Sequence, residues 1–152
     1  MNTAVADKPR ATRKRTPKAP PVVDRATQYA QQVLDGEVIA GPHVRDACAR
    51  HLRDLVNAPA RGLRWSLEGA AEGIAFFEEV LRLNGGQFEG KPFILQGWQA
   101  FIVGCLYGWL RGDVRRFRVA YVETGKGSGK SPLAAGVGMK GLVADDEARA
   151  EI

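Results

Sequence analysis

The sequence contains no long uninterrupted run of apolar residues. A helix that spans a bilayer needs about 20 consecutive apolar residues, and no stretch of the 152 residues approaches that length. The basic N-terminus is also not followed by the apolar segment of a secretory signal. The sequence therefore predicts a protein that is soluble, is not secreted and makes no contact with a membrane.

Cysteine and histidine are scarce, with two of each in the chain. Cys48 and Cys105 each fall at an apolar position of an expected helix, and there is no Cys-x-x-Cys pair. This disfavours a disulfide or a zinc site and predicts two buried free thiols. His51 lies at the edge of an apolar helical stripe, so we expect a packed or capping histidine instead of a catalytic one.

The excess of positive charge is confined to the N-terminus. The net charge is +5, and residues 1–25 carry all of it, because acidic and basic side chains balance in the rest of the chain. Residues 1–23 also hold four prolines and almost no large apolar side chains, which predicts a disordered basic tail. Contact with nucleic acid and a purely solubilising role are both open for this tail.

From Asp24 onward, apolar residues recur at helical spacing. Asp24 and Ser66 are suited to cap the helices that follow them. Charged residues outside the apolar stripes are expected to be solvated, namely Arg45, Asp46, Arg50, Arg53, Asp54, Glu78, Glu79, Arg115, Arg116 and Arg118. Helices are expected over residues 24–34, 42–56, 66–83 and 97–110.

A glycine-rich segment, Thr124-Gly125-Lys126-Gly127-Ser128-Gly129-Lys130-Ser131, carries the clearest functional signal. An alternating apolar run over residues 117–122 precedes it and is expected to be a strand, and a helix is expected from the loop to residue 143. The order strand, glycine loop, helix is typical of a phosphate-binding loop. Glycines let backbone N–H groups approach phosphate oxygens, and the helix start adds the positive end of its dipole.

Two side chains of this segment have expected roles. Lys130 would reach the β- and γ-phosphates of ATP, and the Ser131 hydroxyl would bind Mg²⁺. The pattern G-x-x-x-x-G-K-[ST] is met except at its first position, where Thr124 replaces glycine. An inert, flexible surface loop is the alternative. In the following helix, Gly136 and its neighbouring glycines are expected to permit close approach to a sheet.

Hydrolysis of ATP requires a second apolar strand that ends in carboxylates. The residues after Val143 include Asp145, Asp146 and Glu147 but no apolar lead-in. We therefore expect the N-terminal piece of a longer protein that does not turn over nucleotide by itself. The predicted fold class is an incomplete α/β fold, with a helical N-terminal subdomain before the first strand, P-loop and helix of a P-loop NTPase.

Gln99 is a candidate for contact with a nucleotide base. It is expected to point away from the apolar stripe of its helix, and its amide can donate and accept at once, which suits an adenine edge. A surface glutamine without such a role is equally consistent with the sequence.

Several segments together resemble the start of the large subunit of tailed-phage terminases. They are Gly90-Lys91-Pro92-Phe93, Leu95-Gln96-Gly97-Trp98-Gln99, Tyr107-Gly108-Trp109, residues 115–118 and residues 125–135, with a similar helical lead-in from Tyr29 to Leu55. The resemblance implies a viral DNA-packaging motor in the host cytoplasm, with an ATPase domain joined to a metal-dependent nuclease. It also implies double-stranded viral DNA, a portal protein, a terminase small subunit and further copies of the chain as partners.

The resemblance also assigns roles to individual residues. It implies that Gln99 reads adenine and that Lys130 and Ser131 bind the phosphates and Mg²⁺. It places Lys126 where the family often has a catalytic arginine, and a lysine keeps the charge but loses the bidentate fork. The implied nucleotide-binding residues are Gln99, Gly125, Gly127, Ser128, Gly129, Lys130 and Ser131.

The expected organisation is a basic tail over residues 1–23, a helical lead-in over 24–112 and an ATPase segment over 113–152. Two alternatives remain. Another P-loop ATPase, such as a helicase-like translocase, would share the loop. A non-enzymatic helical binding module with a basic arm would carry the loop as an inert turn.

Overall fold

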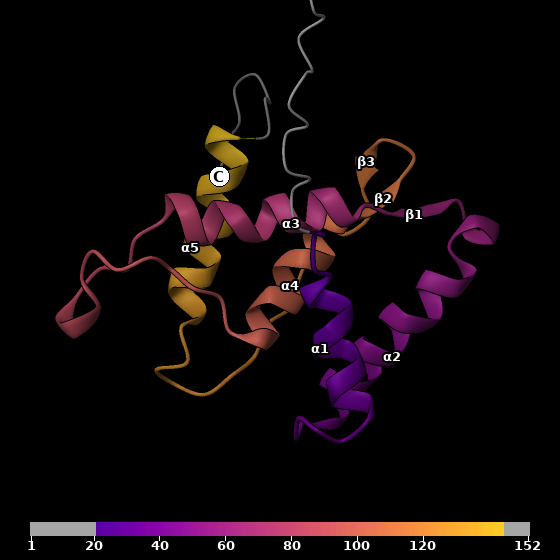
Figure 1. Cartoon of the computed structure of the whole chain (residues 1–152), viewed down its shortest axis with the longest axis horizontal. Helices are drawn as coiled ribbons and strands as arrows, with labels where there is room; N and C mark the ends of the chain where they lie inside the picture. Colours follow the sequence, from indigo (N-terminus) through magenta and orange to yellow (C-terminus); the bar gives the residue numbers. More distant parts are fainter. Residues whose placement is uncertain (1–20, 145–152) are drawn as a thin grey trace, which may run out of the picture.

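The computed structural model describes residues 21–144 (Figure 1). Residues 1–20 of the predicted tail lie outside this range. The described part contains helices α1 to α5 and strands β1 to β3, together with three short helical turns. The α-helices are α1 (Arg25–Leu34), α2 (Pro42–Asn57), α3 (Leu67–Ala75), α4 (Gly97–Gly108) and α5 (Lys130–Val143). The strands are β1 (Leu63–Trp65), β2 (Trp109–Arg111) and β3 (Val114–Arg115), and the turns are η1 (Pro59–Arg61), η2 (Phe76–Val80, a π-helical turn) and η3 (Gly86–Phe88).

Helix α4 lies at the centre of the fold. Both α1 and α3 pack against it, and α2 packs on α1. One core cluster surrounds Phe101 between α4, α1 and α2, and another surrounds Val103 between α4, α3 and α5. Because α4 is covered on more than one side, its apolar residues surround the helix axis instead of forming one stripe. The predicted helix over residues 97–110 is confirmed as far as Gly108, where the chain enters β2.

The three strands form a small antiparallel sheet in the order β1-β2-β3. Leu63 of β1 pairs with Arg111 of β2, and Leu110 of β2 pairs with Arg115 of β3. Strands of two or three residues are too short to show an alternating pattern, which is why the sequence did not predict them. The sheet joins the end of α4 to the segment that leads into α3 (Figure 1).

The predicted strand over residues 117–122 is wrong. This segment has no regular secondary structure, and Val119 and Tyr121 are each 86% exposed. A strand exists only where a neighbour pairs with its N–H and C=O groups, and no described strand lies beside this segment. The described part of the chain is therefore a mixed helical fold with a small antiparallel sheet.

Both predicted helix caps are confirmed. The Asp24 carboxylate accepts a hydrogen bond from the backbone N–H of Thr27 at 2.9 Å. The Ser66 hydroxyl accepts one from Gly69 N–H at 3.0 Å. Each bond satisfies an N–H group that has no partner inside its own helix.

Asp54, predicted to be solvated, is fully buried. Its carboxylate forms ion pairs with Arg61 and with Arg116, whose Nη1 lies 2.7 Å from Asp54 Oδ2. Arg116, also predicted to be solvated, has a side chain only 12% exposed and lies over the rings of Trp109 and Phe117. A buried charge is tolerated only when it is paired, so each of these two residues accounts for the burial of the other.

Glu78 is a further exception to the predicted solvated face. It is half-buried in the π-helical turn that ends α3, and its Oε1 accepts hydrogen bonds from Arg25 Nη1 at 2.7 Å and from Leu95 N–H at 3.0 Å. These bonds hold the segment before α4 against the end of α3. The adjacent Glu79 is exposed, as predicted.

His51 is a buried, packed histidine, as predicted. Its Nδ1 accepts a hydrogen bond from Trp109 Nε1 at 2.9 Å, which places the ring proton on Nε2, 2.9 Å from Thr27 Oγ1. The Thr27 hydroxyl donates in turn to Asp24 at 2.7 Å. Burial lowers the pKa of His51 to about 4, so the ring is neutral at neutral pH.

We expect stability to fall as the pH is lowered from about 6.5 to about 4, the ordinary and the folded-state pKa of His51. In this window the unfolded chain binds a proton that the folded chain does not. One pKa unit is worth about 1.4 kcal/mol, so the loss at pH 4 is about 2–3 kcal/mol. Urea unfolding at pH 7 and at pH 4.5 measures it. His51→Gln, which cannot titrate, should lose clearly less between these two pH values, and an equal loss in both proteins would contradict the assignment.

Cys48 and Cys105 are free thiols, as predicted, but only Cys48 is fully buried and Cys105 is partly exposed. Burial raises the pKa of Cys48 to about 11 and that of Cys105 to about 12, so both are protonated at neutral pH. None of the helices in the described range has the length and apolar character needed to cross a bilayer.

Candidate phosphate-binding site

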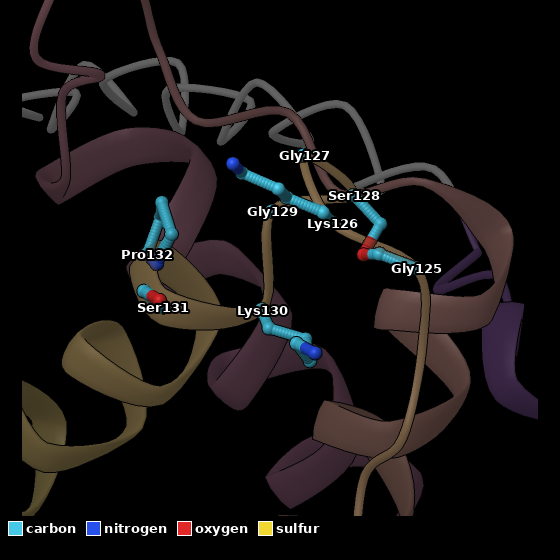
Figure 2. Close-up of a pocket in the computed structure, with 8 residues that line it drawn as sticks. All are labelled: Gly125, Lys126, Gly127, Ser128, Gly129, Lys130, Ser131 and Pro132. Carbon is cyan, nitrogen blue, oxygen red and sulfur yellow. The ribbon is translucent and has the colours of Figure 1, made fainter.

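Residues 124–129 form a turn that leads directly into α5 (Figure 2). Gly127 has φ +83° and Gly129 has φ +85°, both in the left-handed region. Residues with a Cβ rarely adopt this conformation, whereas glycine does so at little cost. The two glycines therefore account for the sharp reversal of the chain at the start of the helix.

The loop surrounds a hollow of about 460 Å³ that is lined by residues 125–132. Helix α5 begins at Lys130, and no side chain caps its N-terminus. The first N–H groups of a helix have no acceptor within the helix, so this end offers donors and a positive dipole to an anion. Pro132 falls in the first turn, where its missing N–H costs nothing.

Lys130 folds back across the loop. Its Nζ donates a hydrogen bond to the backbone carbonyl of Thr124 at 2.8 Å, and among the described residues no carboxylate pairs with it. Figure 2 shows the Lys130 side chain turned toward the incoming chain, whereas Lys126 extends away from the loop. The Lys130 ammonium is thus a positive charge at the hollow that no acid neutralises within the described range.

Thr124, which replaces the first glycine of the pattern, closes the loop. Its hydroxyl is hydrogen-bonded to the Ser128 hydroxyl, and Ser128 Oγ donates to the Gly125 carbonyl at 2.8 Å. These bonds tie the two sides of the turn together. The departure from the pattern therefore adds a cross-loop contact that glycine could not make.

Gln99, in the first turn of α4, lies against this loop although the two are distant in sequence. A Cβ placed on Gly129 would lie 3.2 Å from Gln99 Nε2. Gln99 is only 4% exposed, and its Oε1 accepts a hydrogen bond from Gln96 N–H at 2.9 Å. The surface position that the sequence left open for Gln99 is therefore wrong, because the side chain is buried beside the loop.

Helix α5 is held against other helices. Leu133 is 3% exposed and belongs to the core cluster between α3 and α4. A Cβ on Gly136 would lie 2.2 Å from a ring carbon of Phe77, so only glycine fits this contact. The predicted approach of Gly136 to a sheet is therefore wrong, because Phe77 in the π-helical turn after α3 occupies that place.

The structure gathers the predicted site residues in one region. Ser131 lines the hollow and is exposed, as is Lys126. The described residues contain no group of three or more histidine, cysteine or acidic side chains that could hold a metal ion. The roles of the individual residues stay predictions. Those that line the hollow are Gly125, Lys126, Gly127, Ser128, Gly129, Lys130 and Ser131.

These features define a glycine turn at an uncapped helix start, the kind of element that can receive an anion, with Lys130 next to the Ser131 hydroxyl. Residues 97–152 match the family described as terminase large subunit, ATPase domain. The match begins at the first residue of α4 and includes the glycine loop, and it confirms the resemblance for this part of the chain. No curated protein and no solved structure matches the chain.

The likeness of the helical lead-in before residue 97 lies outside the matched range and stays a prediction. Sequence reasoning also missed the contact between Thr124 and Ser128 in the loop and, outside the residues that line the hollow, the ion pair between Asp54 and Arg116. No periodic signal marks either pair, since both depend on the path of the folded chain.

Proposed function

We propose that the chain binds ATP with Mg²⁺ through residues 124–131, as the nucleotide-binding part of a bacteriophage terminase large subunit with a P-loop. One observation carries the proposal: within the range matched to the ATPase domain, the glycine turn leads into α5 and places the unneutralised Lys130 ammonium at its hollow. These features favour a working phosphate loop over an inert, flexible surface loop.

The residues present fit a triphosphate. The positive φ values at Gly127 and Gly129 bring the backbone close to the hollow, and the uncapped start of α5 supplies N–H donors. Lys130 exchanges its carbonyl partner for phosphate oxygens, which is favourable because the new hydrogen bonds join opposite charges. The Ser131 hydroxyl provides an oxygen ligand of the kind Mg²⁺ prefers. ATP hydrolysis supplies the free energy that drives a motor of this class.

The wider role is a proposal that extends the match to the terminase ATPase domain. We propose that the complete motor acts in the host cytoplasm on double-stranded viral DNA, with a portal protein, a small subunit and further copies of this chain as partners. The terminase ATPase match supports this role. Lys126 lies in the same loop and, exposed at its surface, is free to meet the γ-phosphate or a neighbouring subunit.

Replacing Ser131 with alanine tests the metal side of the site. We expect Mg²⁺ to strengthen ATP binding to the unmodified chain about tenfold, the effect of one good ligand or charged hydrogen bond. Ser131→Ala should lose most of this gain, and Ser131→Thr, which keeps a hydroxyl, should retain it. Titration of a fluorescent ATP analogue with and without Mg²⁺ measures both. ATP binding that is absent from the unmodified chain, or equal Mg²⁺ gains in all three proteins, would contradict the proposal.

A further inference from the structure

The amide of Gln99 is engaged on two sides. On one side, Oε1 accepts the hydrogen bond from Gln96 N–H, which ties the side chain to the beginning of α4. On the other side, Nε2 lies so close to Gly129 that a Cβ there would be 3.2 Å away. With 4% of the residue exposed, little of the amide remains open to a ligand.

We infer that Gln99 positions Gly129 in the glycine loop and does not read the base of the nucleotide. The inference rests on the proposed binding of a nucleotide at this loop. To read adenine, the amide must present its oxygen and its nitrogen side by side to one base edge. Here the oxygen already accepts a hydrogen bond from Gln96 N–H, and Gln99 is 4% exposed and is not among the residues that line the hollow. The amide therefore does not present both of its groups to one base edge.

A donor alone does not distinguish the two purines. Adenine and guanine both carry an acceptor at N7, and they differ in the neighbouring group, which is a donor in adenine and an acceptor in guanine. Discrimination by Gln99 would need its oxygen free to accept from adenine. That oxygen already accepts from Gln96 N–H with one lone pair, and at 4% exposure of the residue the other is not open to a base.

The same contact explains why the amide matters to the loop. Gly129 has φ +85° and is the N-cap residue immediately before α5. The Gln99 amide fills the space beside its Cα and so limits the movement of Gly129. Because Gln99 is also fixed to the start of α4, the loop is supported by the central helix. Removal of the amide should loosen the loop for every nucleoside triphosphate alike.

The affinities of the full chain for fluorescent ATP and GTP analogues, measured with Mg²⁺, test this inference. Gln99→Ala should weaken both by the same factor, between about twofold and tenfold, the effect of one lost hydrogen bond. The quotient of the ATP and GTP affinities should therefore stay constant within about threefold. Gln99→Glu keeps an acceptor for Gln96 N–H, so its melting temperature should stay near that of the unmodified chain while that of Gln99→Ala falls.

A quotient that changes tenfold or more on replacing Gln99 would identify it as a base reader and overturn the inference. Unchanged affinity for both nucleotides in Gln99→Ala would overturn the positioning role. If Gln99→Ala does not fold, the quotient in Gln99→Glu, which keeps the helix cap, decides the same question. Failure of the unmodified chain to bind either nucleotide would instead overturn the proposed function, and with it this inference.

Discussion

Lys130→Ala is expected to weaken ATP binding at least about a hundredfold. The Lys130 side chain lines the hollow and folds back across the loop. A hydrogen bond between its charged ammonium and a phosphate oxygen is worth about 1.5–3 kcal/mol. Two such bonds correspond to roughly two to four powers of ten in affinity. Equilibrium titration with a fluorescent ATP analogue measures the change directly.

A matched control for Lys130→Ala is Lys91→Ala, which removes the same charge from an exposed lysine that lies over the ring of Phe88. It should change ATP affinity by less than about twofold, because Lys91 is not among the residues that line the hollow and the field of an exposed charge is screened by salt. Lys130 is itself exposed, so Lys130→Ala should leave the unfolding free energy within about 0.5 kcal/mol. Equal losses of affinity in the two variants would mean that only net charge matters, and the loop would have no specific role.

Asp54→Asn is expected to destabilise the fold by about 3–5 kcal/mol, the usual cost of breaking a buried ion pair. The neutral amide of the new side chain could not neutralise Arg116, whose side chain is only 12% exposed and packs over Trp109 and Phe117. Most of this loss of stability comes from the buried charge that is left without a partner, and less from the attraction within the pair. Urea unfolding followed by circular dichroism gives the difference in unfolding free energy.

Two further variants test whether the loss of stability comes from the unpaired charge of Arg116 or from any substitution of an acidic residue in α2. Asp46→Asn removes an exposed carboxylate from the same helix and should change stability by less than about 0.5 kcal/mol. Asp54→Leu combined with Arg116→Met removes both charges and should recover much of the lost stability. If the double variant is no more stable than Asp54→Asn, the buried pair does not explain the effect.

Helices and caps were predictable because they depend on neighbours within one turn. The spacing of apolar residues located α1 to α4, and Asp24 and Ser66 marked two of the starts. The short strands were not predictable, since two or three residues show no period. Large apolar residues recur at alternate positions over residues 117–122, as they do in a strand. A strand also needs a neighbouring strand as hydrogen-bond partner, and no described strand pairs with this segment.

Buried charge was the other failure of the sequence analysis. Asp54 and Glu78 lie off the apolar stripes of their helices, and the ordinary expectation for such residues is solvent. Their partners, Arg116 and Arg25, are more than fifty residues away in the chain. Only the path of the folded chain brings such pairs together, and a helical wheel holds no information about it.

The glycine loop was predictable in outline but not in detail. Its glycines predicted a backbone that bends before a helix, and Gly127 and Gly129 provide that bend in the left-handed region. The Thr124 and Ser128 contact and the position of Gln99 beside Gly129 follow from local geometry that a motif does not encode. These details decide how tightly the loop is preorganised.

An NMR titration of the ¹⁵N-labelled chain with ATP and Mg²⁺ tests the central claim most directly. If backbone amides in the loop and at the start of α5 donate to the phosphates, the N–H signals of residues 126–131 should show the largest changes. AMP, which lacks the terminal phosphates, should produce much smaller changes at equal concentration. Changes of equal size for AMP and ATP, or changes that leave residues 126–131 unaffected, would contradict phosphate binding by this loop.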